Sequence, residues 1–318
     1  MEKTAKYSIV VPVFNEDQVL EEFHMRITSV MQSVHESYEL IFINDGSQDR
    51  SSAIIESLHE KDETVKLLSF SRNFGHQVAI TAGMDCSSGQ AVIVIDSDLQ
   101  DPPEVILEMI KKWKEGHDVV YGKRIRRKER SLFKKTTAAI FYRVLRSITD
   151  SDIPVDVGDF RLIDRRVCDV MKGFTEKNRY VRGLVSWVGF RQAAVEYERD
   201  ERFAGKTKYS LGKMMKFAID AATSFSHKPL KMASYLGVFF SGVSFVYLLV
   251  VLYERVFTEK TVVGWTSIVA VNLFFNGIVL IILGAIGEYI GRIYDESKNR
   301  PLYIIESKKG FGDESIGR

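Results

Sequence analysis

The sequence predicts an α/β domain with a mainly parallel sheet, followed by interfacial amphipathic helices and two C-terminal transmembrane helices. Three observations lead to this prediction. Apolar runs of strand length alternate with amphipathic stretches through the first part of the chain. A basic stretch with helical spacing of apolar residues follows at Arg202–Lys231. Two stretches without any charged residue, Met232–Tyr253 and Thr261–Gly287, come next.

The first part of the chain alternates predicted strands with predicted helices. We expect strands at Ser8–Val13, Glu39–Ile43, Val65–Phe70 and Ala91–Ile95, and helices at Asp17–Val34, Asp49–His59 and His76–Ser87. Continuous Val- and Ile-rich strands that alternate with helices are typical of a parallel sheet covered on both faces. Neither a GxGxxG motif nor a P-loop motif occurs, which excludes the usual dinucleotide and P-loop sites.

Polar residues gather where each predicted strand ends. The four clusters are Asn15-Glu16, Asp45-Gly46-Ser47, Arg72-Asn73 and Asp96–Asp101. Ligands of open parallel sheets bind outside the carboxyl ends of the strands. We therefore expect the four clusters to form one site.

The strongest local signal is the pair of carboxylates at Asp96 and Asp98, directly after an apolar strand. Two such carboxylates cannot both be buried without partners, so they either share a cation or lie in water. A hard divalent ion with oxygen ligands, Mg²⁺ or Mn²⁺, suits this arrangement and would bridge the carboxylates to a diphosphate.

Asp45 has the same placement after its own strand. Its carboxylate can accept a hydrogen bond from a base or a ribose, and Gly46 allows a close approach of the backbone. The alternative is a helix N-cap, which Ser47 or Asp49 can also supply. The two roles are compatible.

Charge and cysteine content exclude several classes of protein. Lysine and arginine number 44 against 42 aspartate and glutamate, which gives a formal net charge of +2. This balance excludes a histone-like or acidic-tail protein, so any affinity for phosphate must come from local clusters. The two cysteines, Cys86 and Cys168, fit no metal spacing and are too few for a disulfide framework. We expect a reduced, cytosol-facing protein.

Two basic stretches suggest contact with phosphate or lipid. Lys123–Lys135 contains only one aromatic residue, Phe133, which argues against a nucleic-acid binder. Arg202–Lys231 combines basic residues with helical spacing of apolar residues and leads into an uncharged stretch. This pattern is typical of a helix in the membrane interface. A helix packed on the domain is the alternative.

The uncharged stretches are long enough to cross a bilayer. At about 1.5 Å per residue they form helices of roughly 33 and 40 Å, against a hydrocarbon core of about 30 Å. A pair of buried core helices is the alternative. The loop Glu254–Lys260 holds two basic residues, whereas seven precede the first stretch and six follow the second. This asymmetry predicts that both termini are cytoplasmic. The N-terminus has no signal-peptide pattern.

Seven motifs, in order, carry a family resemblance. They are Val11–Glu16, Asn44–Ser47, Ser71–His76, Asp96–Glu104, Tyr121–Arg124, Gly158–Leu162 and Arg202–Ser210. They resemble family 2 glycosyltransferases with a GT-A fold. Together with the two predicted spans, the chain looks like a polyisoprenyl-phosphate glycosyltransferase, a group that includes bactoprenol glucosyltransferase and dolichol-phosphate mannose synthase. The resemblance covers nearly the whole chain.

The resemblance implies a role for each matching residue. The predicted nucleotide-sugar residues are Pro12, Phe14, Glu16, Asp45, Arg72, Asp96, Arg202 and Lys208, of which Arg202 and Lys208 belong to a loop that closes on the donor diphosphate. The metal ligands for Mg²⁺ or Mn²⁺ match Asp96, Asp98 and Gln100. The acceptor phosphate matches Arg124, Lys134 and Lys135. The residues expected to be catalytic are Asp159, Asp98 and Arg202.

Asp159 is the position usually proposed as the catalytic base in the resembled family. A phosphate monoester acceptor has a second pKa near ~6, so it is already an oxyanion at neutral pH and needs no proton removed. Asp159 is therefore expected to be essential as a base, as an orienter of Arg161 or a phosphate-binding cation, or as a stabiliser of an oxocarbenium-like sugar.

The implied activity is inverting transfer of a sugar, glucose first, from a UDP-sugar to a membrane polyprenyl phosphate. UDP-N-acetylglucosamine and GDP-mannose are alternative donors. A polysaccharide synthase is less favoured because no QxxRW-type motif occurs and two spans cannot enclose a polymer channel. A non-catalytic scaffold is disfavoured because the acidic motif, Arg202 and Lys208 are all present. Anchored relatives suggest a homo-oligomer.

The predicted organisation follows from these signals. We expect a cytosolic GT-A catalytic domain at 1–200, a diphosphate loop with juxtamembrane helices at 201–231, transmembrane helices at 232–253 and 261–287 around a short external loop at 254–260, and a cytosolic tail at 288–318. The protein is expected to be a multi-pass protein of the cytoplasmic membrane, with its catalytic domain in the cytoplasm.

Overall fold

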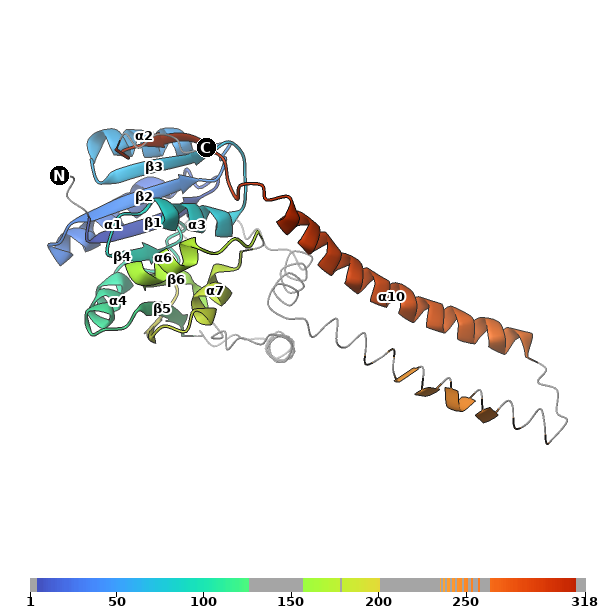
Figure 1. Cartoon of the computed structure of the whole chain (residues 1–318). Coiled ribbons are helices and arrows are strands. Elements are labelled where there is room, and N and C mark those ends of the chain that lie inside the picture. The colour runs from blue at the N-terminus through green and yellow to red at the C-terminus, as the bar shows by residue number, and fades with distance from the viewer. Residues whose placement is uncertain are drawn as a thin grey trace. The chain divides into compact units, whose positions relative to one another are not determined.

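The structure is a computed structural model that describes residues 5–125, 157–177, 179–200 and 264–312, together with isolated residues between 235 and 257. The chain divides into two compact units. One contains residues 1–142, 151–210 and 300–318, and the other contains 143–150 and 211–299. Figure 1 shows the first unit as a sheet with helices around it, and the second as the unit of the long helix α10 (Trp265–Ser297).

Within the described residues, the strands of the first unit form one sheet in the order β7-β5-β6-β4-β1-β2-β3-β8. The strands are β1 (Tyr7–Val13), β2 (Tyr38–Asn44), β3 (Val65–Phe70), β4 (Ala91–Val94), β5 (Val119–Arg124), β6 (Val157–Asp164), β7 (Gln192–Tyr197) and β8 (Ile305–Lys309). The central strands β4, β1, β2 and β3 are parallel, whereas β6 pairs antiparallel with both β4 and β5, and β8 pairs antiparallel with β3.

Helices cover both faces of this sheet. They are α1 (Leu20–Val34), α2 (Ser51–Lys61), α3 (His76–Cys86), α4 (Val105–Lys114), α6 (Arg165–Lys172) and α7 (Val181–Trp187). Phe23 of α1, Ile55 of α2 and Met109 of α4 share one hydrophobic core with alternate residues of β1. Burial of both faces explains why all seven residues of β1 are buried and why its sequence is apolar except for Ser8.

Helix α3 packs on the other face at very short range. A Cβ atom added at Gly83 would lie 2.3 Å from Cγ1 of Val10 and 2.7 Å from Cδ1 of Ile43. These two side chains belong to β1 and β2 and point away from the α1 face. The glycine therefore allows α3 to lie directly on the centre of the sheet.

The structure confirms the α/β prediction with its mostly parallel sheet. The four predicted strands and three predicted helices appear with ends that differ by three residues or fewer. The sequence did not predict β8, whose five residues, IESKK, contain four polar or charged side chains. An edge strand lacks a second neighbour and can expose its side chains, so it has no apolar pattern.

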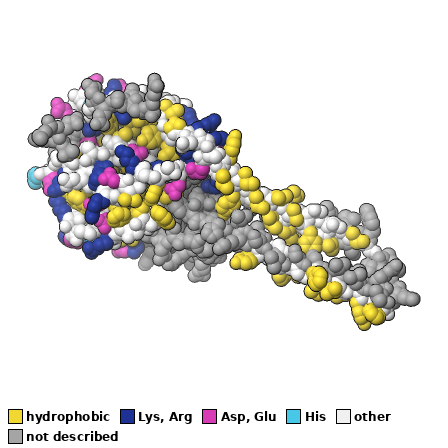
Figure 2. All heavy atoms as spheres, viewed as in Figure 1, with side chains coloured by type: hydrophobic (Ala, Val, Ile, Leu, Met, Phe, Trp, Pro, Cys, Tyr) yellow, Lys and Arg dark blue, Asp and Glu magenta, His cyan; other side chains and the backbone are white. Residues whose placement is uncertain are grey.

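Helix α10 is the one described helix that is long and apolar enough to cross a membrane, over Phe274–Ser297. It continues to Ser297, ten residues beyond the predicted end of the second span at Gly287. Figure 2 shows hydrophobic side chains over its surface, and exposed residues such as Leu280 and Ile290 belong to them.

The first predicted span is only partly described. Its described residues, from Tyr235 onward, are helical, and the ring of Phe240 lies 5.8 Å from that of Phe274 and 5.7 Å from that of Phe275 in α10. Residues 201–231, expected to form the diphosphate loop and interfacial helices, lie outside the described residues.

The packing of α3 gives a stability prediction. We expect Gly83→Ala to destabilise the catalytic domain by about 1–3 kcal/mol, because the added methyl group must displace Val10 or Ile43 in a filled core. Chemical denaturation followed by tryptophan fluorescence measures the change. Cys86→Ala, on the same helix, adds no atoms and serves as the control. Equal stability of the Gly83 variant and the wild type would show that the close packing is wrong.

Candidate active site

The structure joins the polar clusters after β1, β2, β3 and β4 at one edge of the sheet, as the sequence predicts. The backbone N–H of Asn15 donates to Oγ of Ser47 at 3.1 Å, which links the ends of β1 and β2. His76, at the start of α3, lies 3.4 Å from the carboxylate of Asp96 after β4. Hydrogen bonds that the Asp45 carboxylate accepts link the ends of β2 and β3.

Asp45 fixes the loop that follows β3. Its buried carboxylate accepts hydrogen bonds from the backbone N–H of Phe74 at 2.7 Å, from that of Gly75 at 3.0 Å and from Nδ2 of Asn73 at 2.9 Å. Gly46, at φ +67°, lets the loop approach, since a Cβ there would lie 2.5 Å from the carbonyl carbon of Arg72. In this structure Asp45 organises the loop, and its predicted contact with the nucleotide remains a prediction.

The acidic motif after β4 is held in a tight turn. Leu99 is buried and has a φ of +56°, a conformation that costs free energy for a residue with a branched side chain. This turn brings the backbone N–H of Gln100 to 3.1 Å from Oδ1 of Asp98, so it donates a hydrogen bond to that carboxylate. The side chain of Asp98 is largely buried.

Asp96 has one carboxylate oxygen, Oδ1, that lies 3.4 Å from Nε2 of His76 but accepts no hydrogen bond within the described parts of the chain. This oxygen atom is buried. Burial raises the pKa of Asp96 to about 6, and the neighbouring carboxylates of Asp159, Asp101 and Asp98 add to the shift, although His76 opposes it. Such a group gains from any cation placed beside it.

These residues fit a hard divalent cation. The buried oxygen of Asp96 that accepts no hydrogen bond from the described residues, the carboxylate of Asp98 and the side-chain amide of Gln100 are oxygen ligands of the kind that Mg²⁺ and Mn²⁺ take. Among the described residues, no group of three or more His, Cys, Asp or Glu side chains forms a complete metal cluster. Other ligands of such an ion would come from substrate and water.

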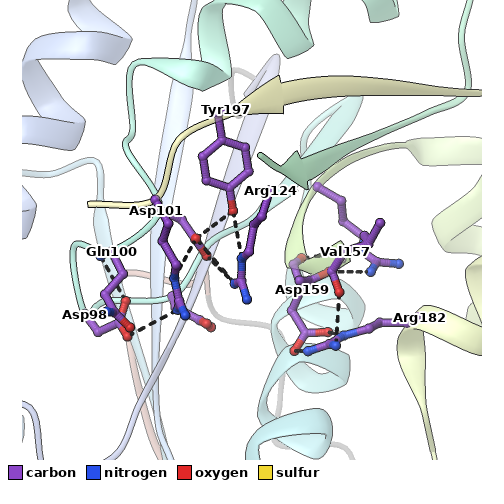
Figure 3. A network of polar contacts seen from close by, with 12 residues as sticks. Asp98, Gln100, Asp101, Arg124, Val157, Asp159, Arg182 and Tyr197 are labelled. Atoms are coloured by element: carbon purple, nitrogen blue, oxygen red, sulfur yellow. Dashed lines mark hydrogen bonds and ion pairs between the residues drawn. The ribbon is translucent and has the colours of Figure 1, made fainter. Parts of the chain in front are cut away.

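Asp101 is the centre of a second network (Figure 3). This fully buried carboxylate accepts hydrogen bonds from the hydroxyl of Tyr197 at 2.6 Å and from Nη2 of Arg124 at 3.1 Å, and Nε of Arg199 lies 3.3 Å away. Burial opposes the charge of Arg124, but Asp101 raises the pKa of the guanidinium above its ordinary value. Arg124, predicted to attract the acceptor phosphate, is thus held in place by a buried acid.

Asp159 lies in a third network, also drawn in Figure 3. Arg182 of α7 donates two hydrogen bonds to its carboxylate, from Nε at 2.8 Å and from Nη2 at 3.0 Å. Nε2 of His76 and Nε2 of Gln77 each lie 3.2 Å from Oδ2. Burial favours the protonated form, but the hydrogen bonds from Arg182 and His76 hold the pKa of Asp159 well below its usual range.

This arrangement bears on the three roles considered for Asp159. A carboxylate with a strongly lowered pKa is a poor proton acceptor, which disfavours a general base. Its side chain orients Arg182 rather than Arg161, since Arg161 donates to the backbone oxygens of Gly158 and Asp159. The pKa of His76 is raised to about 9, because Asp159 and Asp96 outweigh the effect of burial.

The remaining predicted residues differ in how much the structure says of them. Pro12 lies in β1, and the side chain of Phe14, just after it, is exposed. The guanidinium of Arg72 lies 4.1 Å from the ring centroid of Phe74. Four predicted residues, Lys134, Lys135, Arg202 and Lys208, lie outside the described residues.

An open hollow of about 520 Å³ lies beside the ends of β1, β2 and β3. Its lining residues are Phe14, Asn44, Gly46, Ser47, Gln48, Ser52, Glu56, Ser69, Phe70, Ser71, Arg72, Asn73, Glu306 and Ser307. Two predicted nucleotide-sugar residues, Phe14 and Arg72, are among them. Glu306 and Ser307 come from β8, near the C-terminus.

The sequence model of glycosyl transferase family 2 matches residues 8–171, more than half of the chain. The chain belongs to glycosyl transferase family 2. The resemblance inferred from the motifs is therefore confirmed, and with it the GT-A fold and the glycosyltransferase activity.

Relatives of this glycosyltransferase match along its full length. The uncharacterized glycosyltransferase YkcC of Bacillus subtilis (strain 168) is 59% identical over 100% of this chain and 98% of its own length. The bactoprenol glucosyl transferase of Shigella phage SfV is 43% identical over 96% of this chain and 99% of its own. The prophage bactoprenol glucosyl transferase homolog of Escherichia coli (strain K12) is 41% identical over 96% of this chain and 99% of its own length.

Several side chains of the glycosyltransferase site were not predicted from the sequence. The sequence places Asp101 only within an acidic cluster, and it does not mark Tyr197, Arg182 or Arg199 as site residues. Arg182 is 23 residues from Asp159 along the chain and lies on a different element. No local pattern marks such a pairing. The sequence can indicate that a buried acid requires a cationic partner. It does not indicate which arginine forms the ion pair with that acid.

The Asp159 network gives the second prediction. Arg182→Ala is expected to destabilise the protein by about 3–5 kcal/mol at pH 7, because it leaves the buried carboxylate of Asp159 without its main partner. The lowered pKa of Asp159 stabilises the fold above the unfolded pKa of about 4, and this contribution is lost as the pH falls through the folded value. The stability difference between variant and wild type should therefore shrink in acid.

Denaturation curves at several pH values measure this effect. Arg166→Ala is a matched control, since Arg166 also pairs with carboxylates, those of Asp164 and Asp118, but its own side chain is 72% exposed. A similar loss in both variants would contradict the special role of Arg182.

Proposed function

We propose that this glycosyltransferase transfers glucose from UDP-glucose to a membrane polyprenyl phosphate, with inversion at the anomeric carbon. The observation that carries the proposal is the 41–43% identity to bactoprenol glucosyl transferases over 95–96% of the chain. This match extends beyond the catalytic domain into α10, a segment that a glycosyltransferase with a soluble acceptor would not need. UDP-N-acetylglucosamine and GDP-mannose are the alternative donors.

The chemistry of the acceptor supports the same proposal. A lipid phosphate is an oxyanion at neutral pH, so its oxygen attacks the anomeric carbon without a general base. The bond from that carbon to the donor diphosphate breaks, UDP leaves, and the sugar becomes β-linked to the lipid phosphate. The paired, ionised state of Asp159 agrees with a reaction that needs no proton acceptor there. Asp159 then acts by orienting Arg182, and His76 with it.

The proposed metal site consists of Asp96, Asp98 and Gln100, for Mg²⁺ or Mn²⁺. A bound divalent ion would neutralise charge on the departing diphosphate. Arg202 and Lys208 are proposed to bind the same diphosphate, and Arg124, Lys134 and Lys135 to attract the acceptor phosphate. Asp101 supports this role of Arg124 because it fixes the guanidinium next to the acidic motif.

We propose a two-span hairpin with the catalytic domain and both termini in the cytoplasm. The contacts of Phe240 with Phe274 and Phe275 support packing of the 232–253 segment against α10. The interfacial helices at 201–231 and the external loop at 254–260 belong to this proposal. The site then lies near the lipid headgroups, so the apolar acceptor remains in the bilayer. A homo-oligomer stays a prediction from the resemblance.

A turnover assay tests the proposed reaction. Purified protein in detergent should convert UDP-glucose and polyprenyl phosphate to polyprenyl-phosphate-glucose with Mg²⁺ or Mn²⁺, and mass spectrometry identifies the lipid product. Asp98→Ala should lower turnover at least ~100-fold, in line with the loss of charge stabilisation of several kcal/mol at the leaving group. Glu108→Ala, on the exposed side of α4, should retain normal turnover.

Two outcomes contradict parts of this proposal. If turnover is undiminished in excess chelator, or in the Asp98→Ala variant, the proposed metal site is wrong. Faster use of UDP-N-acetylglucosamine or GDP-mannose in the same assay would replace glucose by the corresponding sugar.

A reporter fusion tests the topology. A reporter placed after Arg318 should give a cytoplasmic signal, and one inserted in the 254–260 loop an external signal, because the basic residues lie mainly outside that loop. An external signal from the C-terminal fusion would exclude the two-span hairpin.

A further inference from the structure

The tail strand β8 is built into the sheet beside the hollow described above. It is the outermost strand and runs antiparallel to β3, as Figure 1 shows. Tyr303, just before it, stacks on Phe70 with 5.3 Å between ring centroids, and the backbone N–H of Ser71 donates to the carbonyl of Ile304 at 3.1 Å. Lys309 forms an ion pair with Glu56 of α2 at 2.9 Å.

A bulge in β8 directs two successive residues to the hollow. Ser69 pairs with Ser307, but the next residue of β3, Phe70, pairs with Ile305, so Glu306 is an extra residue without a partner position on β3. Neighbouring residues of a regular strand point to opposite faces. A bulge changes this direction locally, and Glu306 and Ser307 both line the hollow.

The floor of the hollow holds an unsatisfied hydroxyl. Ser69 is only 5% exposed, and its Oγ atom has no hydrogen-bond partner in the described part of the protein. A buried hydroxyl without a partner costs about 1–3 kcal/mol. Because Ser69 lines the hollow opposite Ser307, a polar ligand there would satisfy this group.

The charges of the lining favour a neutral ligand group. Glu306 is exposed at the hollow, and Glu56 lies beside it with Lys309 as its partner. Carboxylates next to a phosphate would repel it, whereas a neutral polar ring is not repelled. Phe14, 39% exposed, is an aromatic side chain in the same lining and suits stacking against such a ring. Arg72 adds hydrogen-bond donors.

We propose that Ser69, Glu306 and Ser307 bind the donor's nucleobase and select uracil, so that the tail strand is a specificity-determining wall of the donor site. Uracil presents one N–H donor between two carbonyl acceptors. A carboxylate accepts from the N–H, and the serine hydroxyls donate to the carbonyl oxygens. The inference rests on one part of the proposed function, which is that the donor is a nucleotide-sugar.

The Ser69 hydroxyl gives the sharpest test, with UDP as the probe and the full chain in detergent. Ser69→Ala should weaken UDP binding about threefold to tenfold, the value of one neutral hydrogen bond. The melting temperature without nucleotide should stay equal or rise, because no hydrogen bond of the free protein is lost.

Ser88→Ala is the matched control for this variant. The hydroxyl of Ser88 already donates to Glu39 at 2.9 Å, far from the strand ends that form the hollow. Its removal should lower the melting temperature and leave UDP binding unchanged. The proposal is overturned if Ser69→Ala binds UDP as the wild type does, or if it loses stability as Ser88→Ala does.

The tail strand is tested separately from the diphosphate contacts. Ser307→Trp fills the hollow from an exposed position and should abolish UDP binding. Glu306→Ala should lower the preference for UDP over CDP at least ~threefold, because the ring N–H of uracil that Glu306 would accept from is an acceptor nitrogen in cytosine. Neither variant should weaken binding of inorganic diphosphate. Glu63→Gln, an exposed residue at the other end of β3, is the control. Equal loss of UDP and diphosphate would overturn the proposal.

These binding measurements need no lipid acceptor, so they are independent of the proposed transfer. If the variants change UDP binding as expected but the wild-type protein forms no lipid-linked sugar, the inference stands and the proposed lipid acceptor is wrong. If the protein glycosylates the lipid normally but its tail variants bind UDP like the wild type, the proposed function stands and the inference about the tail strand is overturned. A wild-type protein that bound no UDP would also overturn the inference.

Discussion

Compensation of buried carboxylates is the constraint on which the site depends. Asp96, Asp98, Asp101 and Asp159 lie close together at the end of β4 and on β6. Burial disfavours the charged forms of Asp96 and Asp159. Arginines and a histidine compensate most of this charge. Asp96 keeps a buried oxygen without a hydrogen bond among the described residues, and its pKa is the one raised to about 6. Compensation is therefore unequal, and the divalent cation is proposed at the least compensated acid.

The same interactions hold some side chains of the site rigidly beside the groups that are proposed to bind substrate. Asp101 and Asp159 are held by arginines from distant elements, which fixes both side chains in place. The lowered pKa of Asp159 disfavours this group as a proton acceptor. This agrees with an acceptor that is already an anion. Leu99, in its strained conformation, directs Asp98 and Gln100 to the edge where the proposed ion would lie.

Much of the fold could be predicted because its signals are local. Each central strand is a mainly apolar run, and each polar cluster follows such a run directly, so the parallel sheet brings the clusters together. The tail strand could not be predicted in this way, since its residues are mostly charged and it pairs with β3 more than 200 positions earlier. The pairing of Arg182 with Asp159 is equally invisible in either local sequence.

By itself, the sequence determined the family, the order of the central strands and helices, the acidic motif and the uncharged C-terminal stretches, because periodicity and motif spacing are properties of neighbouring residues. Only the tertiary structure decided which cationic side chain pairs with each buried acid. It also decided where the hollow has an unsatisfied hydroxyl, and that the C-terminal tail forms a strand of the sheet. Those features depend on the packing of segments far apart in the chain. Because charged groups interact more strongly when they are buried, this packing has large electrostatic effects. No local sequence pattern encodes them.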